Sequence, residues 1–111
     1  MDELIYYNTM PAGDEMDTLV HHNVMKAELL TGYYPPHYST DISAAWKIVE
    51  KLIENPYIFP QLHYSHNWVF EIWKNNPFER DGYEYLALVY AETVPLAICR
   101  AALIAITKLE N

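Results

Sequence analysis

The chain has 111 residues, of which 51% are hydrophobic and 20% charged, enough for one domain with its own core and too apolar for a disordered chain. A formal charge of −8 disfavours non-specific binding to nucleic acid, and the single cysteine excludes an internal disulfide. No apolar run reaches the roughly 18 residues of a membrane span and the start lacks a secretory pattern, so we expect one soluble domain, residues 1–111, without a membrane partner.

A first amphipathic helix is predicted to follow a short N-terminal start. The sequence Met10-Pro11-Ala12-Gly13-Asp14 is typical of a helix entry. Apolar residues then recur at helical spacing as far as about Leu30, namely Met16, Leu19, Val20, Val24 and Ala27. Residues 31–38 contain two prolines and a glycine, which prevent the helix from continuing, so they form an aromatic-rich loop.

A second helix is predicted to begin at Ser39-Thr40-Asp41 and to end at Pro56. The hydroxyl and carboxylate groups at its start are suited to accept the unpaired N–H groups of a first helical turn. We expect one buried stripe on this helix, formed by Ile42, Ala45, Trp46, Val49 and Ile53.

Three strands follow, because residues 57–64, 68–73 and 83–91 are rich in β-branched and aromatic side chains. Ser65-His66-Asn67 is short enough for a hairpin, and Pro60 favours an edge strand or a bulge. A strong turn signal at residues 75–82 favours a second hairpin. Alternation places Trp68 and Trp73 on opposite faces, and both faces are apolar enough to need a cover.

Thr93 is expected to cap a last helix, with Pro95 tolerated in its first turn. The helix runs through Ile106 and is almost wholly apolar, so we expect it to be central. The predicted order is helix, helix, three strands, helix. The fold class is therefore α+β, a three-stranded antiparallel meander covered on both faces by helices, an α-β-α sandwich.

Several segments of the chain resemble the phage ABA sandwich family. Its two signature segments are similar to Pro36–Trp46 with Glu50-Lys51, and to Glu92–Leu103. Asp17–Val20 and Val24-Met25 resemble the family's first helix. The resemblance implies a phage or prophage source, the cytoplasm of the bacterial host and the sandwich fold, and it transfers no catalytic residue.

The order helix, three strands, helix also matches a double-stranded-RNA-binding domain. Such a domain needs a cluster of lysines at the start of its last helix to bind phosphates. Here that turn is Thr93-Val94-Pro95-Leu96, with only Arg100 beyond it. We therefore expect no nucleic-acid partner.

The start of the second helix is the candidate ligand site, because helix N-termini suit phosphate or carboxylate groups and flat aromatic rings suit a nucleobase. Simple capping is the alternative role of its polar residues. Arg100, the only charge between Val94 and Thr107, either emerges at an edge, pairs with a carboxylate such as Asp41 or Glu50, or binds a phosphate. The candidate residues are Tyr33, Tyr34, His37, Tyr38, Ser39, Thr40 and Arg100.

We predict no metal site, no cofactor and no catalytic residue. His21 and His22 are adjacent and point about 100° apart on a helix, and His63 and His66 flank a turn without a third ligand. Cys99 lies among alanines, where a small buried thiol is expected rather than a nucleophile.

The leading hypothesis is a phage accessory protein that counters host defence by sequestering a nucleotide-type signal, such as a cyclic ADP-ribose or a cyclic dinucleotide. A homo-oligomer is expected, because a three-stranded sheet has exposed edges. The alternatives are an inhibitor or adaptor that binds a host protein through its acidic surface or exposed tyrosines, and a structural part of the virion.

Overall fold

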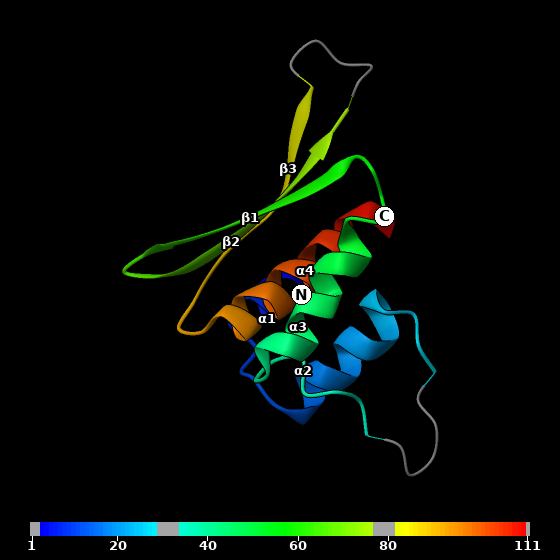
Figure 1. Ribbon diagram of the computed structural model, residues 1–111, viewed down its shortest axis with the longest axis vertical. Helices are drawn as coiled ribbons and strands as arrows, with labels where there is room; N and C mark the ends of the chain where they lie inside the picture. The colour runs from blue at the N-terminus through cyan, green and yellow to red at the C-terminus, as the bar shows by residue number, and fades with distance from the viewer. Residues whose placement is uncertain (1–2, 29–33, 77–81, 111) are drawn as a thin grey trace.

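In the part of the chain that the structure describes, the fold consists of a three-stranded antiparallel sheet and four α-helices, one of which continues into a π-helical segment (Figure 1). The structure, a computed structural model, describes residues 3–28, 34–76 and 82–110. The elements in chain order are α1 (Glu3–Thr9), α2 (Asp14–Leu19), η1 (Val20–Val24), α3 (Ile42–Leu52), β1 (Ile58–Ser65), β2 (Asn67–Asn75), β3 (Tyr83–Ala91) and α4 (Val94–Glu110).

The sheet is a meander with the order β1-β2-β3, as the sequence predicts. The first hairpin is tight, because Ser65 pairs with Asn67 across His66, whose φ is 67°. β1 is an edge strand, which accounts for Pro60 within it. The irregularity in the strand register falls elsewhere, between Ile72 and Trp73 of β2 opposite β3.

Helix α4 lies at the centre of the fold, which confirms the expectation from its apolar sequence. It packs against β2 and β3 on one side and against α1, α3 and η1 on its others. Eight of its residues are buried, namely Ala97, Ile98, Cys99, Ala101, Ala102, Leu103, Ile104 and Ala105. Among the described residues no helix is both long and apolar enough to span a bilayer.

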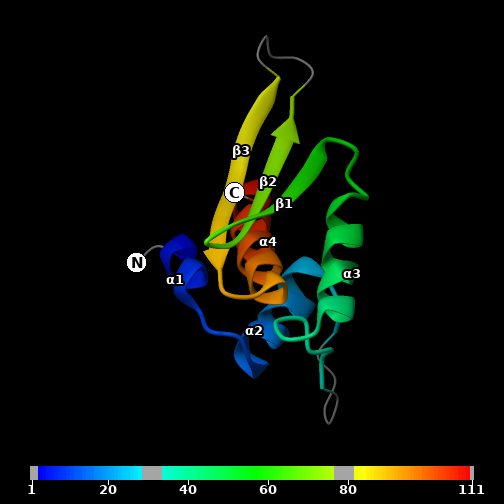
Figure 2. The same ribbon diagram turned by 60° about the vertical axis from the view of Figure 1, so that its left-hand side comes forward.

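The α+β class is confirmed, but the layers differ from the expected cover on both faces. All described helices lie on one side of the sheet, in the order sheet, α4, then α3 with α2 and η1 (Figures 1 and 2). α1 lies beside α4 next to the β3 edge (Figure 2). Phe70, Ile72 and Val89 face this core, and Trp68 packs partly against it. The opposite face is open, because no described helix covers it (Figures 1 and 2), and it carries Trp73, which pairs with Phe59 and Tyr85.

Two predictions for the N-terminal region are corrected. Helix α1 occupies the short start for which no helix was predicted, and it is held because Tyr7 and the following Met10 are buried in the core. The next helix begins at Asp14 as expected but ends at Val24 rather than near Leu30. Lys26 adopts a left-handed conformation with φ 56°, which a continuing helix does not allow.

The buried stripe of α3 is also corrected. Ala45 and Val49 are buried as predicted, but Ile42, Trp46 and Ile53 are about half exposed. Ala44, Ile48 and Leu52 complete the buried face. The helix is therefore rotated by roughly one position from the expected phase, because its apolar residues outnumber the positions that can face α4.

This rotation predicts very different costs for one substitution at two isoleucines. Ile48→Ala should destabilise the fold by about 2–5 kcal/mol, because it opens a cavity under a fully buried side chain. Ile53→Ala, at a side chain that is 51% exposed, should cost less than about 1 kcal/mol. Urea unfolding measures both, and a loss at Ile53 as large as that at Ile48 would contradict this burial pattern.

Candidate functional site

A groove of about 880 Å³ lies where the starts of α3 and α4 come together, and they are side by side in both views (Figures 1 and 2). The α1–α2 connection, the end of β3 and the first residue of β2 complete its walls. It is lined by Pro11, Ala12, Ser39, Thr40, Ile42, Asn67, Tyr90, Ala91, Glu92, Thr93, Pro95, Leu96 and Arg100. Its volume is in the range of small-molecule sites, roughly 300–1,000 Å³.

Both helices that begin at the groove are capped by side chains. Asp41 is the N-cap of α3, and one of its carboxylate oxygens accepts the Ser43 amide at 2.9 Å. The Thr93 hydroxyl accepts the Leu96 amide at 3.4 Å at the start of α4. The two helix N-termini bring partial positive charge to the same groove.

Arg100 comes to the groove from the second turn of α4 and is half-buried. Its Nε donates a hydrogen bond to the carbonyl oxygen of Met10 at 2.9 Å. Neither Asp41 nor Glu50 pairs with it, so the predicted ion pair is wrong. Burial lowers the pKa of the guanidinium and the charge of Glu92 acts in the opposite direction. Among the described residues its terminal nitrogens have no acceptor.

A buried polar joint holds the segment before α3 against α2. Asp17, 3% exposed, accepts hydrogen bonds at Oδ1 from the Ser39 amide at 2.8 Å and the Ser39 hydroxyl at 2.7 Å. The Gly13 amide in turn donates to the Ser39 hydroxyl oxygen at 2.9 Å. Ser39 is therefore positioned by these bonds, and it places Thr40 at the groove.

Not all of the predicted ligand-binding residues reach the groove. Ser39, Thr40 and Arg100 line it. Tyr38 is a correction, because its ring is buried in the core and its hydroxyl shares a 2.9 Å hydrogen bond with Nδ1 of His21, so it cannot stack on a ligand.

The remaining three candidates lie away from the groove walls or outside the described chain. Tyr34 is 84% exposed, and the exposed His37 lies next to Asp17. Tyr33 lies outside the described residues.

Cys99 is fully buried, as expected from its alanine-rich surroundings. Burial raises the pKa of its thiol far above the ordinary value, and the charge of Asp17 adds to this. The side chain therefore stays a thiol and packs as a small apolar group.

A second surface, the open face of the sheet, carries a cluster of aromatic rings. The Phe59 and Trp73 rings are stacked with centroids 6.3 Å apart, Tyr83 meets Phe59 edge-on at 5.5 Å, and Tyr85 lies 4.4 Å from Trp73. We call these four residues the aromatic face. Next to it, Nε2 of His63 and a carboxylate oxygen of Glu71 are 2.8 Å apart. Slight burial, and then Glu71, raise the pKa of Tyr85.

Sequence reasoning missed the contributions of Tyr90, Glu92 and Thr93 to the groove. All three lie at the junction of β3 and α4. The predicted end of the third strand and start of the last helix could have identified them. A short strand-to-helix connection places its polar residues beside the N-terminus of the helix.

The sequence profile of the phage ABA sandwich domain matches residues 10–103. The match begins at Met10, the first residue after α1, extends into α4 and leaves α1 outside. Searches of curated proteins and of solved structures gave no significant match.

The buried joint predicts unequal costs for two neighbouring hydroxyl residues. Ser39→Ala should destabilise the fold by about 1–3 kcal/mol, because Asp17 and the Gly13 amide each lose a hydrogen bond. Thr40→Ala, at an exposed side chain, should stay within about 0.5 kcal/mol of the wild type. Chemical unfolding of both variants tests this. A Ser39 variant as stable as the Thr40 variant would show that the joint contributes nothing.

Proposed function

The chain belongs to the phage ABA sandwich domain family, and we propose that it binds and sequesters a nucleotide-type signal of host defence, such as a cyclic ADP-ribose or a cyclic dinucleotide. The protein would act as a phage accessory factor in the cytoplasm of the bacterial host. The groove between the starts of α3 and α4 is the proposed binding site.

The observation that carries the proposal is the meeting of Arg100 with two helix N-termini at one groove. Among the described lining residues Arg100 is the only cation and Glu92 the only carboxylate, in a chain whose formal charge is −8. Phosphate oxygens suit both the guanidinium and the N–H groups of a helix start.

The apolar part of the groove supplies a surface for a base or a ribose. Tyr90 is 56% exposed, and Pro95 and Leu96 line the same groove. A nucleobase gains about 1–3 kcal/mol from stacking on an aromatic ring. The groove therefore offers separate surfaces for the charged and the flat parts of a nucleotide.

We propose binding rather than catalysis, because the nearby hydroxyl and thiol groups are not set up to act as nucleophiles. The Ser39 hydroxyl is occupied by Asp17 and Gly13, and the described lining residues include no histidine to act as its base. Cys99 is buried as a thiol inside α4.

A thermal-shift screen of the purified chain against cyclic nucleotides, ADP-ribose derivatives and nucleoside phosphates tests the proposal. A ligand at 100 times its dissociation constant should stabilise the fold by about 2.7 kcal/mol. The shift should be lost in Arg100→Ala and kept in the control Lys47→Ala, which removes an exposed cation on α3. The ligand-induced shift of each variant is compared with its own unliganded melting temperature, because Arg100→Ala also removes the bond to Met10.

Two results would contradict sequestration at the groove. One is that no compound of the screen changes the melting temperature, even at high ligand concentration. The other is a shift of equal size in the wild type and in Arg100→Ala, which would move the binding site elsewhere.

The aromatic face supports a second candidate function, an inhibitor or adaptor that binds a host protein. Tyr83 is 63% exposed and Tyr85 is 40% exposed. Exposed aromatic rings grouped around a tryptophan are typical of protein interfaces. A homo-oligomer through the exposed edges of the sheet is compatible with either function and is part of the proposal.

The two functions are separable, because Tyr83 and Tyr85 lie outside the groove lining. The double variant Tyr83→Ser/Tyr85→Ser should abolish capture of a host protein from bacterial lysate and leave nucleotide shifts unchanged. Tyr57→Ser/Tyr64→Ser is the matched control, with two exposed tyrosines outside the aromatic face. Quantitative mass spectrometry identifies the captured protein, and equal capture by both double variants would exclude the aromatic face as its binding surface.

A further inference from the structure

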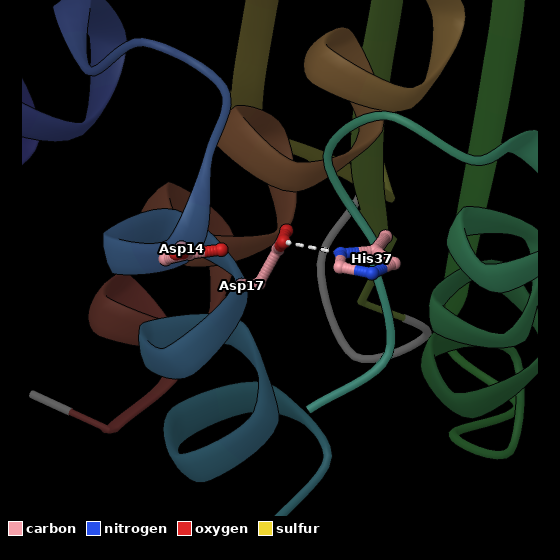
Figure 3. Close-up of side chains that lie close together, drawn as sticks. All are labelled: Asp14, Asp17 and His37. Carbon is pink, nitrogen blue, oxygen red and sulfur yellow. Dashed lines mark ion pairs between the residues drawn. The ribbon is translucent and has the colours of Figure 1, made fainter. Parts of the chain in front are cut away.

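Three metal-ligating side chains far apart in the sequence come together next to the buried joint. Asp14 and Asp17 lie one turn apart at the start of α2, and His37 comes from the segment before α3 (Figure 3). One ligand atom from each lies within 4.8 Å of the other two. We propose that Asp14, Asp17 and His37 bind one divalent transition-metal ion.

The buried carboxylate of Asp17 is the observation that points to a ligand. Its side chain is only 4% exposed, and Oδ1 accepts both hydrogen bonds from Ser39. Oδ2 accepts no hydrogen bond from the described residues and points at Nδ1 of His37, 3.7 Å away (Figure 3). The Ser39 hydrogen bonds leave the negative charge of this nearly buried carboxylate in place, and a cation at Oδ2 would neutralise it.

The negative charge of the cluster is not neutralised by a lysine or an arginine among the described residues. The carboxylates of Asp14 and Asp17 repel each other at this separation. In the described chain no lysine or arginine pairs with either, since Lys26 pairs with Glu110 and Lys51 with Glu54. His37 supplies a positive charge only when it is protonated.

The spacing of the ligand atoms fits a single ion. With metal–ligand bonds of about 2.0–2.2 Å, neighbouring ligands of an octahedral or tetrahedral ion lie about 2.8–3.6 Å apart. The 3.7 Å between Asp17 and His37 is close to this, and Asp14 and His37 are exposed and able to rotate inward. Three protein ligands leave further positions for water.

The ligand set selects the class of ion. Two carboxylates and one imidazole suit Zn²⁺, Mn²⁺ and Co²⁺, whereas Mg²⁺ and Ca²⁺ prefer oxygen ligands alone. Because affinity for divalent metals generally rises from Mn²⁺ to Zn²⁺ at such sites, Zn²⁺ should bind more tightly than Mn²⁺.

A bound ion would tie α2 to the segment that carries Ser39, next to the joint between Asp17 and Ser39. Its role is to hold this part of the groove wall in place, so the inference stands independently of any nucleotide. The test therefore contains no nucleotide.

Isothermal titration calorimetry of the tag-free full chain with Zn²⁺, and visible absorption with Co²⁺ as a probe of imidazole binding, test the site. We expect one ion per chain, and a loss of affinity of at least about ten-fold in Asp14→Asn and in His37→Ala. Both side chains are exposed, so both variants should fold, which circular dichroism checks.

Two matched controls separate this site from general metal affinity. Glu15→Gln removes the neighbouring exposed carboxylate of α2, and His63→Ala removes the imidazole that is paired with Glu71. Both variants should bind Zn²⁺ and Co²⁺ with an affinity within about two-fold of that of the wild type, because neither residue is a proposed ligand. No heat of binding at millimolar Zn²⁺, or undiminished affinity in His37→Ala, would overturn the proposal.

Discussion

The structure depends on the burial of helix α4. A helix that is apolar on all sides must be covered on all sides, and a three-stranded sheet covers only one. The remaining sides are covered by α1, α3 and η1, all of which contact α4. The helices are therefore gathered on one side of the sheet, the opposite sheet face stays open, and the start of α4 emerges at the surface beside the start of α3 (Figures 1 and 2).

A single polar contact supplements this apolar core where the groove is built. Asp17 projects from α2 into a buried position and binds both the amide and the hydroxyl of Ser39. Apolar packing tolerates small shifts, whereas two charge-assisted hydrogen bonds to one residue fix both its position and its orientation. The segment before α3 is thus held in a defined place, with His37 on one side of the joint and Thr40 on the other.

The strands and α4 could be predicted from the sequence because their patterns are strong and local. The α3 stripe could not, since Trp46 and Ile53 continue the apolar pattern around the helix and only the position of α4 decides which residues are covered. Tyr38 was misassigned for a similar reason. A tyrosine in an aromatic-rich loop is expected to be exposed, but the ring of Tyr38 is buried and its hydroxyl shares a hydrogen bond with His21. The cluster of Asp14, Asp17 and His37 was invisible because its ligands are separated by twenty residues and meet only in the fold.

The charge of the chain limits how a negatively charged ligand reaches the groove. A formal charge of −8 repels an anion at long range, but salt screens this repulsion beyond about 8 Å at physiological ionic strength. Inside the groove the local charges differ, because Arg100 balances Glu92 and two helix N-termini add partial positive charge. Long-range attraction therefore contributes nothing to capture, and tight binding must come from slow release, which depends on how rigidly Arg100 and the segment of Ser39 are held. The bond from Arg100 to Met10 and the joint between Asp17 and Ser39 supply that rigidity.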